Sequence, residues 1–576
     1  MALQLTENAL RILQSRYLKK DHKGTCVESP EEMFQRVANH AASAETRFDP
    51  QAKADETAEA FYHMMASLEF LPNSPTLMNA GRELGQLAAC FVLPVEDSLE
   101  SIFEAVKNTA IIHQSGGGTG FSFSHLRPKN AIVLTTSGVA SGPVSFMRVF
   151  NMATEVIKQG GTRRGANMGI LRVDHPDIIE FITAKKDPQE LTSFNLSVGI
   201  TREFMEALEG GGGFELIDPR TGRTVATIEA RKIFDLIVEC AWGSGEPGVI
   251  FIDHINKDNP TPHLGQIEST NPCGEQPLLP YEACNLGSIN LVKMITEGSE
   301  GPCIDWDKLR RTVRLAVRFL DNVIEINHYP LPQIEQVSRG NRKIGLGVMG
   351  FSHFLILMRA SYDSEAGVKL GEEVMKFIQA EGHDASHELA GLRGPFPNFT
   401  GSRYDQEGNP PLRNATVTTI APTGTLSIIA DCSSGIEPLF ALSYTRRALE
   451  DVELFEIDPI FLLLSKEMGF WRPEMEDTLR QTGFLGSDAA IPPHARKLFV
   501  TAFEIPPARH IQMQAAFQRH TDNAVSKTIN FPPDASMADV REAFLLAYRM
   551  GCKGVTIYRS GTRMGQILTC GLNQLC

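Results

Sequence analysis

Residues 271–275 read NPCGE and residues 284–290 read CNLGSIN, so that polar, thiol and carboxylate side chains share one short stretch. The proline and the glycine of the first segment constrain the chain to a turn. Asn271, Cys273 and Glu275 could then converge on one small ligand as hydrogen-bond donor, sulfur reactant and general base. An ordinary polar turn with an incidental cysteine is the alternative, because turns rich in Asn, Pro and Gly are common.

The ten cysteines do not form a recognisable cluster, since the first eight are scattered from Cys26 to Cys552 without the short paired spacings of a zinc site or a secreted disulfide framework. Neighbouring Gly, Pro, Asn and Glu residues favour an exposed thiol in a reducing cytosol. The cysteines in such settings are Cys90, Cys273, Cys284, Cys570 and Cys576. Cys90 lies in a predicted strand, where a core thiol is the alternative. It could pair with Cys284 if the fold brings their Cα atoms within roughly 7 Å.

The composition is that of an ordinary globular protein, with 576 residues, 42% hydrophobic and 22% charged. A net charge of −14 argues against a broad surface for polymeric nucleic acid, although local basic pockets can still hold phosphates. Residues 1–8 lack a targeting signal, and no stretch approaches the roughly 18 apolar residues of a membrane span. We therefore expect a soluble cytoplasmic protein with no membrane partner.

The order of predicted elements favours a large α/β body preceded by helices. Ser29 and Glu32 form a capping box at the start of a predicted helix, and apolar residues recur at helical spacing between residues 309 and 324. Near the end, strands at 528–531 and 555–558 flank a helix that begins after Ser536, which predicts a βαβ unit. Functional residues are expected on loops at strand ends.

Glycine-rich segments at 116–120, 160–165 and 422–427 are candidate phosphate loops, although each could be an ordinary loop. The third follows a predicted strand at 415–420 and offers hydroxyls and backbone N–H groups suited to a diphosphate. The second adds two guanidinium groups. None of them contains the Lys-Ser/Thr pair of a P-loop.

A further glycine pattern, GLGVMG at 345–350, fits a dinucleotide-binding fingerprint and supports a nicotinamide-dependent dehydrogenase as an alternative function. The preceding residues 338–343 are polar and basic, whereas that fingerprint requires a buried parallel strand there. The sequence therefore disfavours the dehydrogenase.

Taken in order, these segments resemble ribonucleotide reductase large chains from about residue 5 to residue 566. NSPTLMNAG at 73–81 is similar to the family's substrate-phosphate segment, and Cys90 follows at the position of a redox cysteine. The glycine loop, the Arg163-Arg164 loop, NPCGE, Cys284 and PTGT at 422–425 then come in family order.

The resemblance implies a ten-stranded α/β barrel with a central finger loop. It places a helical N-terminal domain at 1–70 and the barrel at 71–562. The finger loop is expected near 271–275 and the effector loops near 97–167. A flexible tail with cysteines is expected at 563–576.

The same resemblance implies thiyl-radical reduction of a ribonucleoside diphosphate to the 2′-deoxyribonucleoside diphosphate, for DNA precursor synthesis. Cys273 would carry the radical and abstract the 3′-hydrogen, Glu275 would take the 3′-hydroxyl proton, and Asn271 would hydrogen-bond the substrate. The 2′-hydroxyl would leave as water, and Cys90 and Cys284 would supply the reducing equivalents and finish as a disulfide.

Binding sites are also implied by the resemblance. The implied substrate site comprises Ser74, Ala89, Cys90, Gly118, Asn271, Glu275, Pro422, Thr423, Gly424 and Thr425. A deoxynucleoside triphosphate effector would bind at the interface of a homodimer, since the family's effector pocket is shared by two chains. Its expected residues are Asp97, Ser98, Arg127, Lys158, Arg163 and Arg164.

The resemblance favours adenosylcobalamin as the radical generator, with no metal ion bound directly by protein side chains. Residues 554–561 contain one tyrosine where iron-dependent relatives carry a dyad, and an iron- or manganese-dependent large subunit is the alternative. Cys570 and Cys576 would pass electrons from a thioredoxin-like reductant, but their spacing is wider than the family's usual pair, which leaves this shuttle open.

Two other classes of function remain to be separated from the reductase. A nucleotide sensor would contain glycine-rich loops but would not need Cys273, Cys90 and Cys284 together. A thiol–disulfide oxidoreductase would act without any nucleotide.

Overall fold

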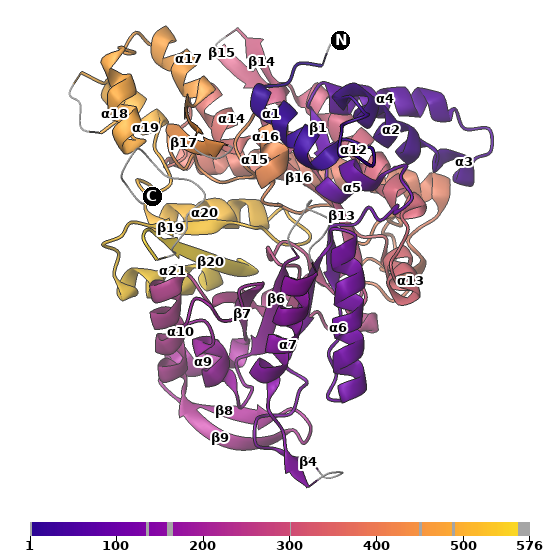
Figure 1. Cartoon of the computed structure of the whole chain (residues 1–576), viewed down its shortest axis with the longest axis vertical. Helices are drawn as coiled ribbons and strands as arrows, with labels where there is room; N and C mark the ends of the chain where they lie inside the picture. Colours follow the sequence, from indigo (N-terminus) through magenta and orange to yellow (C-terminus); the bar gives the residue numbers. More distant parts are fainter. Residues whose placement is uncertain are drawn as a thin grey trace.

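A helical unit opens the chain in the computed structural model, which describes residues 3–133, 137–157, 165–299, 301–448, 452–486 and 490–562. Its elements are α1 (Glu7–Ile12), the π-helical turn η1 (Leu13–Tyr17), α2 (Pro30–Ala42), α3 (Glu45–Phe48) and α4 (Ala54–Ala66). The predicted capping box is confirmed at the start of α2, where the Ser29 side chain accepts from the Glu32 amide and the Glu32 side chain accepts from the Ser29 amide. Figure 1 shows these helices together beside the N-terminus.

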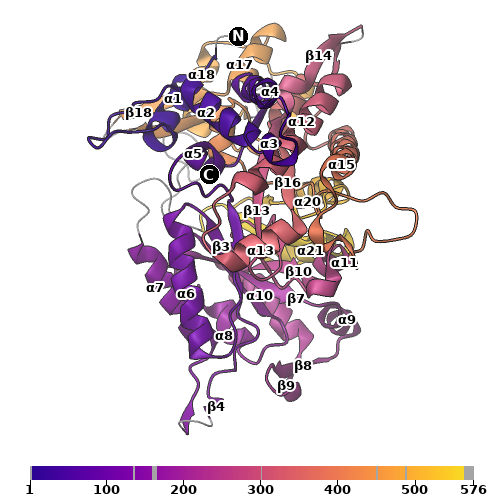
Figure 2. The same ribbon diagram turned by 90° about the vertical axis from the view of Figure 1, so that its right-hand side faces the viewer.

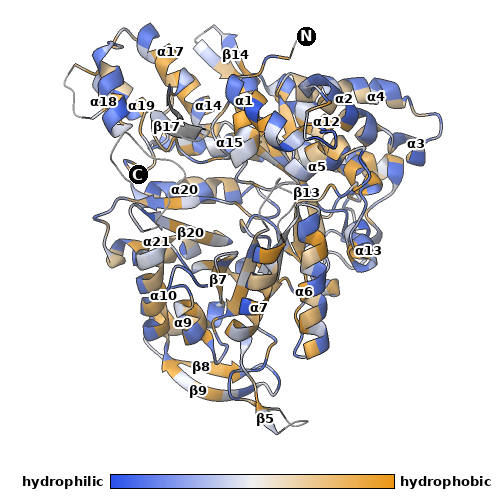
Figure 3. Ribbon diagram, in the orientation of Figure 1, coloured by the Kyte–Doolittle hydropathy of each residue, from blue (hydrophilic) through white to orange (hydrophobic). Residues whose placement is uncertain are grey.

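Five parallel strands form the first half of a barrel. They are β2 (Cys90–Val92), β3 (Gly118–Ser122), β6 (Asn167–Arg172), β7 (Phe194–Ile200) and β10 (Gly248–Phe251). The helices that follow them are α6 (Leu99–Gln114), α7 (Pro143–Val156), α8 (Ile178–Thr183), α9 (Arg202–Gly210) and α10 (Ala230–Ser244). Figure 3 shows α6 and α10 carrying both hydrophobic and hydrophilic residues, as expected of helices that cover a sheet on one side.

The second half runs antiparallel to the first. It contains β13 (Ala283–Asn290), β16 (Ile344–Met349), β19 (Thr528–Phe531) and β20 (Gly554–Arg559). Strand β13 pairs antiparallel with β2, and β20 pairs antiparallel with β10. Parallel bridges from Leu346 to Thr418 and from Ile420 to Val525 connect β16 to the segment just before β19. These bridges close the sheet, which has ten strands among the described residues, so the predicted α/β barrel is confirmed.

The predicted strand at 415–420 is extended but forms only these isolated bridges. The reason lies in its backbone, because the Asp522 carboxylate accepts the amides of Val417 and Thr418 at 2.8 and 3.2 Å. The Asp522 carboxylate therefore takes the backbone N–H groups that would otherwise donate to a neighbouring strand in a continuous sheet. In contrast, the predicted βαβ unit is confirmed, since α21 (Met537–Arg549) connects the parallel strands β19 and β20.

A short hairpin lies between the two halves. Its strands are β11 (Ser269–Thr270) and β12 (Pro277–Leu278), with the NPCGE segment at the tip. A Cβ atom added at Gly120 of β3 would overlap the carbonyl oxygen of Thr270, and one at Gly118 would lie 2.9 Å from Pro272 Cγ. Glycine is therefore required where the hairpin backbone crosses β3. The hairpin is the predicted finger loop.

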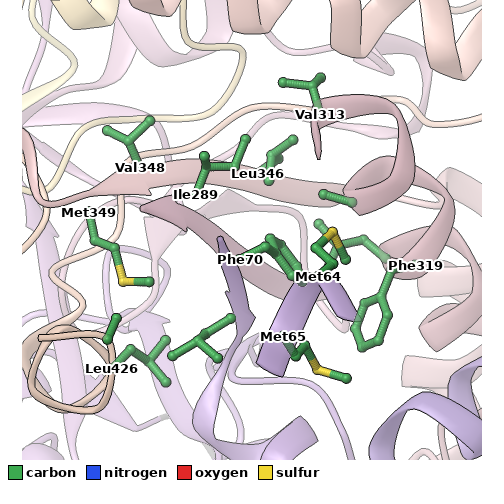
Figure 4. Close-up of a cluster of buried hydrophobic side chains, with 14 of the residues drawn as sticks. Met64, Met65, Phe70, Ile289, Val313, Phe319, Leu346, Val348, Met349 and Leu426 are labelled. Atoms are coloured by element: carbon green, nitrogen blue, oxygen red, sulfur yellow. The ribbon is translucent and has the colours of Figure 1, made fainter. Parts of the chain in front are cut away.

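Two large hydrophobic cores support this arrangement. One joins the N-terminal helices to the second half-barrel through α12 (Trp306–Ile326), the helix predicted from its apolar spacing. Figure 4 shows Met64 of α4 beside Phe70 of β1 (Phe70–Pro72) and Phe319 of α12, with Leu346 and Val348 of β16 above them. The other core fills the space between the first half-barrel and its helices. In Figure 2, β13 and β16 lie between these two regions.

The remaining elements are connections and small additions. Before the finger they are α5 (Ser74–Asn79), β4 (Ile132–Val133), β5 (Gly138–Val139), β8 (Gly213–Asp218), β9 (Arg223–Glu229), α11 (Ile252–Lys257) and η2 (Pro262–Leu264). After it come η3 (Leu291–Met294), β14 (Ile295–Gly298), β15 (Gly301–Ile304), α13 (Pro332–Asn341), α14 (Phe351–Leu357), α15 (Glu365–Arg393), η4 (Pro397–Phe399) and α16 (Gly424–Ile429). A helical insertion contains β17 (Ser443–Ala448), β18 (Val452–Ile457), α17 (Pro459–Glu467), α18 (Glu474–Thr482) and α19 (Pro493–Leu498), and α20 (Pro507–Gln518) follows. Among the described residues, no helix is both long enough and apolar enough to span a membrane.

We predict that Gly120→Ala destabilises the protein by several kcal/mol, because the new methyl group would force the finger backbone away from β3. Gly210→Ala is the matched control, since a Cβ atom there meets nothing within 4 Å. Thermal unfolding of both variants measures the difference. Equal melting temperatures for the two variants would contradict the close packing of finger and barrel.

Candidate active site

A cavity of about 280 Å³ lies where the finger tip meets the N-terminal helices and the loop before α16. Its volume is just below the roughly 300–1,000 Å³ typical of small-molecule sites. The structure brings to its lining every residue predicted for the substrate site, namely Ser74, Ala89, Cys90, Gly118, Asn271, Glu275, Pro422, Thr423, Gly424 and Thr425. These residues come from segments that are far apart in the sequence. The cavity is therefore the candidate active site.

The finger tip is a tight turn held by its own hydrogen bonds. Gly274 N–H donates to Asn271 O at 3.1 Å, and Gln276 N–H donates to the Asn271 side-chain oxygen at 3.0 Å. Gly274 has a φ of +81°, which glycine adopts without strain. Cys273 is exposed while Glu275 is buried, and both line the cavity with Asn271. The sequence left open whether these three side chains converge or form an ordinary polar turn, and the structure places all three on the lining of one cavity.

Segments of both half-barrels hold the finger on its two sides. The Thr419 hydroxyl and the Ala524 amide both donate to the Glu275 carbonyl, at 2.9 and 3.0 Å. From the other half-barrel, the Asn195 side-chain Nδ2 donates to Pro272 O at 2.8 Å. Backbone groups on each side of Cys273 are thus fixed from opposite halves of the barrel.

Cys90 and Cys284 lie directly opposite each other on the antiparallel strands β2 and β13. Opposed residues of this kind have Cα atoms roughly 4.5–5.5 Å apart and side chains on the same face, within the reach of a disulfide. Asn271 Nδ2 donates to Cys90 Sγ at 3.1 Å, which connects the pair to the finger. Cys90 lines the cavity; Cys284 does not, and lies beside it on the adjacent strand.

The expectation that polar neighbours expose these two thiols is wrong, because Cys90 and Cys284 are only 3% and 1% exposed, whereas the alternative of a core thiol on a strand is confirmed for Cys90. Both lie on strands inside the closed barrel, which covers them despite their polar neighbours. Burial raises the pKa of Cys284 well above its ordinary value, and the nearby Lys343 charge only partly opposes this. At neutral pH Cys284 is therefore a thiol and not a thiolate.

The phosphate end of the predicted site combines the starts of two short helices. Asn73 caps α5 by accepting the Thr76 amide at 3.0 Å, and its Nδ2 group is buried with no hydrogen-bond partner among the described residues. Thr423 precedes α16 in a left-handed conformation with a φ of 55°. Backbone N–H groups, hydroxyls and the Asn73 amide are groups that can donate to phosphate oxygens.

Several cavity residues were missed by the sequence reasoning. Arg16 and Tyr17 come from η1, whose sequence carries no motif. Ser288 lies in the quoted CNLGSIN segment, and it shares a strand face with Cys284 because side chains alternate along a strand. That alternation is a signal that could have identified it.

The predicted effector residues are only partly described. Arg127 Nε donates to both carboxylate oxygens of Asp97 at 2.8 and 2.9 Å, and Ser98 caps α6 by accepting the Ser101 amide at 3.1 Å. The structure thus brings Asp97, Ser98 and Arg127 together. The predictions that lie outside the described residues are Lys158, Arg163, Arg164, Cys570 and Cys576.

The GLGVMG pattern does not form a nucleotide-binding turn. Gly345 and Gly347 lie inside β16, and a Cβ atom at Gly347 would overlap the Thr419 carbonyl oxygen. The glycines therefore permit close packing of β16 against the 416–420 segment. Among the described residues, no group of three or more His, Cys, Asp or Glu side chains is arranged to hold a metal ion.

Comparisons with known proteins agree with this geometry. Residues 3–85 match the family "Ribonucleotide reductase, all-alpha domain", and residues 88–411 and 408–558 match "Ribonucleotide reductase, barrel domain". The chain is 48% identical to a protein of Thermoplasma acidophilum named vitamin B12-dependent ribonucleoside-diphosphate reductase, over 99% of this chain and 81% of that one. A protein of the same name from Mycobacterium tuberculosis strain CDC 1551 is also 48% identical, with 98% and 81% covered.

A solved structure shares the fold. The class Id ribonucleotide reductase alpha subunit of Actinobacillus ureae superposes with a TM-score of 0.79, at 23% identity and with 97% of each chain covered.

We predict that mild oxidation with diamide links Cys90 to Cys284, because the two thiols face each other across β2 and β13. Peptide mapping under non-reducing conditions detects the linked peptides. Cys240, which is also buried but lies on α10, should remain a thiol and serves as the control. Recovery of both Cys90 and Cys284 as alkylatable thiols after oxidation and unfolding would refute the pairing.

Proposed function

Because this chain belongs to the ribonucleotide reductase family, we propose that it is the catalytic chain of an adenosylcobalamin-dependent ribonucleoside-diphosphate reductase. It converts ribonucleoside diphosphates to 2′-deoxyribonucleoside diphosphates for DNA synthesis. The observation that carries the proposal is that Cys273, at the finger tip, and Cys90 line one cavity, while Cys284 lies directly opposite Cys90 on the adjacent strand. The names of relatives at 48% identity support both the substrate class and the cofactor.

Each side chain of the site has a part in the reaction. The Cys273 thiyl takes the 3′-hydrogen of the ribose and returns a hydrogen to that carbon at the end. Glu275 accepts the 3′-hydroxyl proton, and Asn271 hydrogen-bonds the sugar. The 2′-hydroxyl leaves as water while the Cys90 and Cys284 thiols provide two electrons and two protons and become a disulfide.

The finger tip has room for the cofactor on its open side. Cys273 is exposed, and a Cβ atom added at Gly274 would meet nothing within 4 Å. The cavity of about 280 Å³ is too small to take a nucleotide and a corrin ring together, so the cofactor would be held outside it, by residues at the exposed finger tip. Cys273 and Gly274 are the residues that would face it. Adenosylcobalamin, when bound, supplies the radical for the Cys273 sulfur.

In this proposal, the effector site and the supply of electrons to the enzyme follow the family pattern. Asp97, Ser98 and Arg127 bind a deoxynucleoside triphosphate effector together with Lys158, Arg163 and Arg164. Exposed apolar residues on two adjacent helices support a homodimer, namely Leu99 and Phe103 of α6 and Met152 and Val156 of α7. Cys570 and Cys576 relay electrons from a thioredoxin-like reductant in the cytoplasm.

We also propose three structural parts, namely a helical unit at 1–70, the barrel at 71–562 and a tail at 563–576. The end of the helix α4 at Ala66, just before the first strand of the barrel sheet, supports a boundary in this region.

We predict that the chain alone converts CDP to dCDP under anaerobic conditions with dithiothreitol and effector, and only when adenosylcobalamin is added. Cys273→Ser should abolish product, because serine has no sulfur to carry the radical. Cys303→Ser, at an exposed cysteine of β15, is the control and should retain full turnover. Chromatography of the dephosphorylated products measures the yield.

Two results of this assay would reject the proposal. Product without cobalamin, or only with an added iron- or manganese-bearing subunit, would assign the chain to the metal-dependent class. Full turnover by the Cys273→Ser variant would exclude a mechanism in which Cys273 carries the radical.

A further inference from the structure

Arg16 lies at the rim of the cavity on η1, a π-helical turn of the N-terminal unit. π-Helical turns of this kind are rare and frequently occur at functional sites. The next residue, Tyr17, is 2% exposed and its hydroxyl is 2.7 Å from Ser74 Oγ, at the start of α5. Arg82 also donates to the Tyr17 carbonyl at 2.6 Å. Tyr17 therefore fixes the backbone of η1 next to the predicted phosphate-binding residues.

The cavity needs a cation that its other residues do not supply. Arg16 is the one Lys or Arg among the described residues that line it, and Glu275 contributes a carboxylate. The remaining groups at the phosphate end are neutral, namely backbone N–H groups, hydroxyls and the Asn73 amide. A nucleoside diphosphate brings several negative charges into this space.

The Arg16 guanidinium is available for such a ligand. Its side chain is exposed, and it makes no hydrogen bond or ion pair with any other described residue. Arginines nearby are engaged, since Arg36 and Arg82 both pair with Glu28, and Arg11 pairs with Glu7. The planar fork of an arginine matches phosphate oxygens in a bidentate way.

We propose that Arg16 binds the diphosphate of the substrate and provides the positive charge of the phosphate site, an inference that rests on the proposed function. The N-terminal helical unit thereby contributes directly to substrate recognition, in addition to packing on the barrel. Because the phosphates are remote from the reacting ribose carbons, this contact stabilises ground state and transition state equally. It acts on KM and not on kcat.

The test compares Arg16→Ala with Arg16→Lys and with Arg11→Ala, which removes the same charge from the preceding helix α1 without touching the cavity. Equilibrium dialysis measures CDP and adenosylcobalamin binding without turnover, and steady-state kinetics measures KM and kcat for CDP. Losing a hydrogen bond to a charged group should weaken CDP binding by Arg16→Ala and raise its KM about 10- to 100-fold, with kcat retained. Arg16→Lys should fall between, and Arg11→Ala should match the wild type.

Each other outcome has a defined meaning. Unchanged CDP affinity in Arg16→Ala, or a loss confined to adenosylcobalamin, overturns the assignment to the diphosphate. Loss of kcat without a change in CDP affinity also overturns it. If the wild type binds CDP through Arg16 but forms no dCDP, the proposed function fails while the binding role of Arg16 stands.

Discussion

The close passage of the finger backbone between two half-barrels is the constraint on which the site depends. Gly120 lets the Thr270 carbonyl approach β3, and the Glu275 carbonyl is held from the opposite side by Thr419 and Ala524. A side chain at Gly120 would displace the hairpin, and Cys273 would then leave its place in the cavity. Gly120 is therefore part of the catalytic arrangement, although it does not line the cavity.

Burial then decides what each cysteine can do. Cys90 and Cys284 lie inside the barrel, where the low polarity keeps the Cys284 sulfur protonated. In that form the pair can deliver hydrogen as well as electrons to a bound sugar. Cys273 lies at an exposed tip, where a radical generator too large for the cavity can reach it. One barrel thus separates a sheltered reducing pair from an accessible radical position.

Local chemistry in the sequence predicted much of the fold. The capping box at Ser29, the apolar spacing within α12 and the β19–α21–β20 unit all follow from neighbouring residues. The barrel itself was implied only by the resemblance to ribonucleotide reductases. The polar neighbours of Cys284 wrongly suggested an exposed thiol, because its burial comes from barrel closure and not from its neighbours. For Cys90, the strand pattern gave the core thiol that the structure has, and the neighbours did not. The sequence did not identify Arg16 as a site residue for a similar reason, since only the tertiary packing of η1 against α5 brings it to the cavity.

The central claim is that the Cys273 sulfur carries the radical. Hydrogen exchange between the cofactor and this sulfur tests that claim most directly. The chain is incubated anaerobically with effector and with adenosylcobalamin that carries tritium on its 5′ carbon, and tritium released into water is counted. If Cys273 exchanges hydrogen with the cofactor, the wild type releases tritium and Cys273→Ser releases none. Equal release by both proteins, or no release by a wild type that binds the cofactor, would contradict the account.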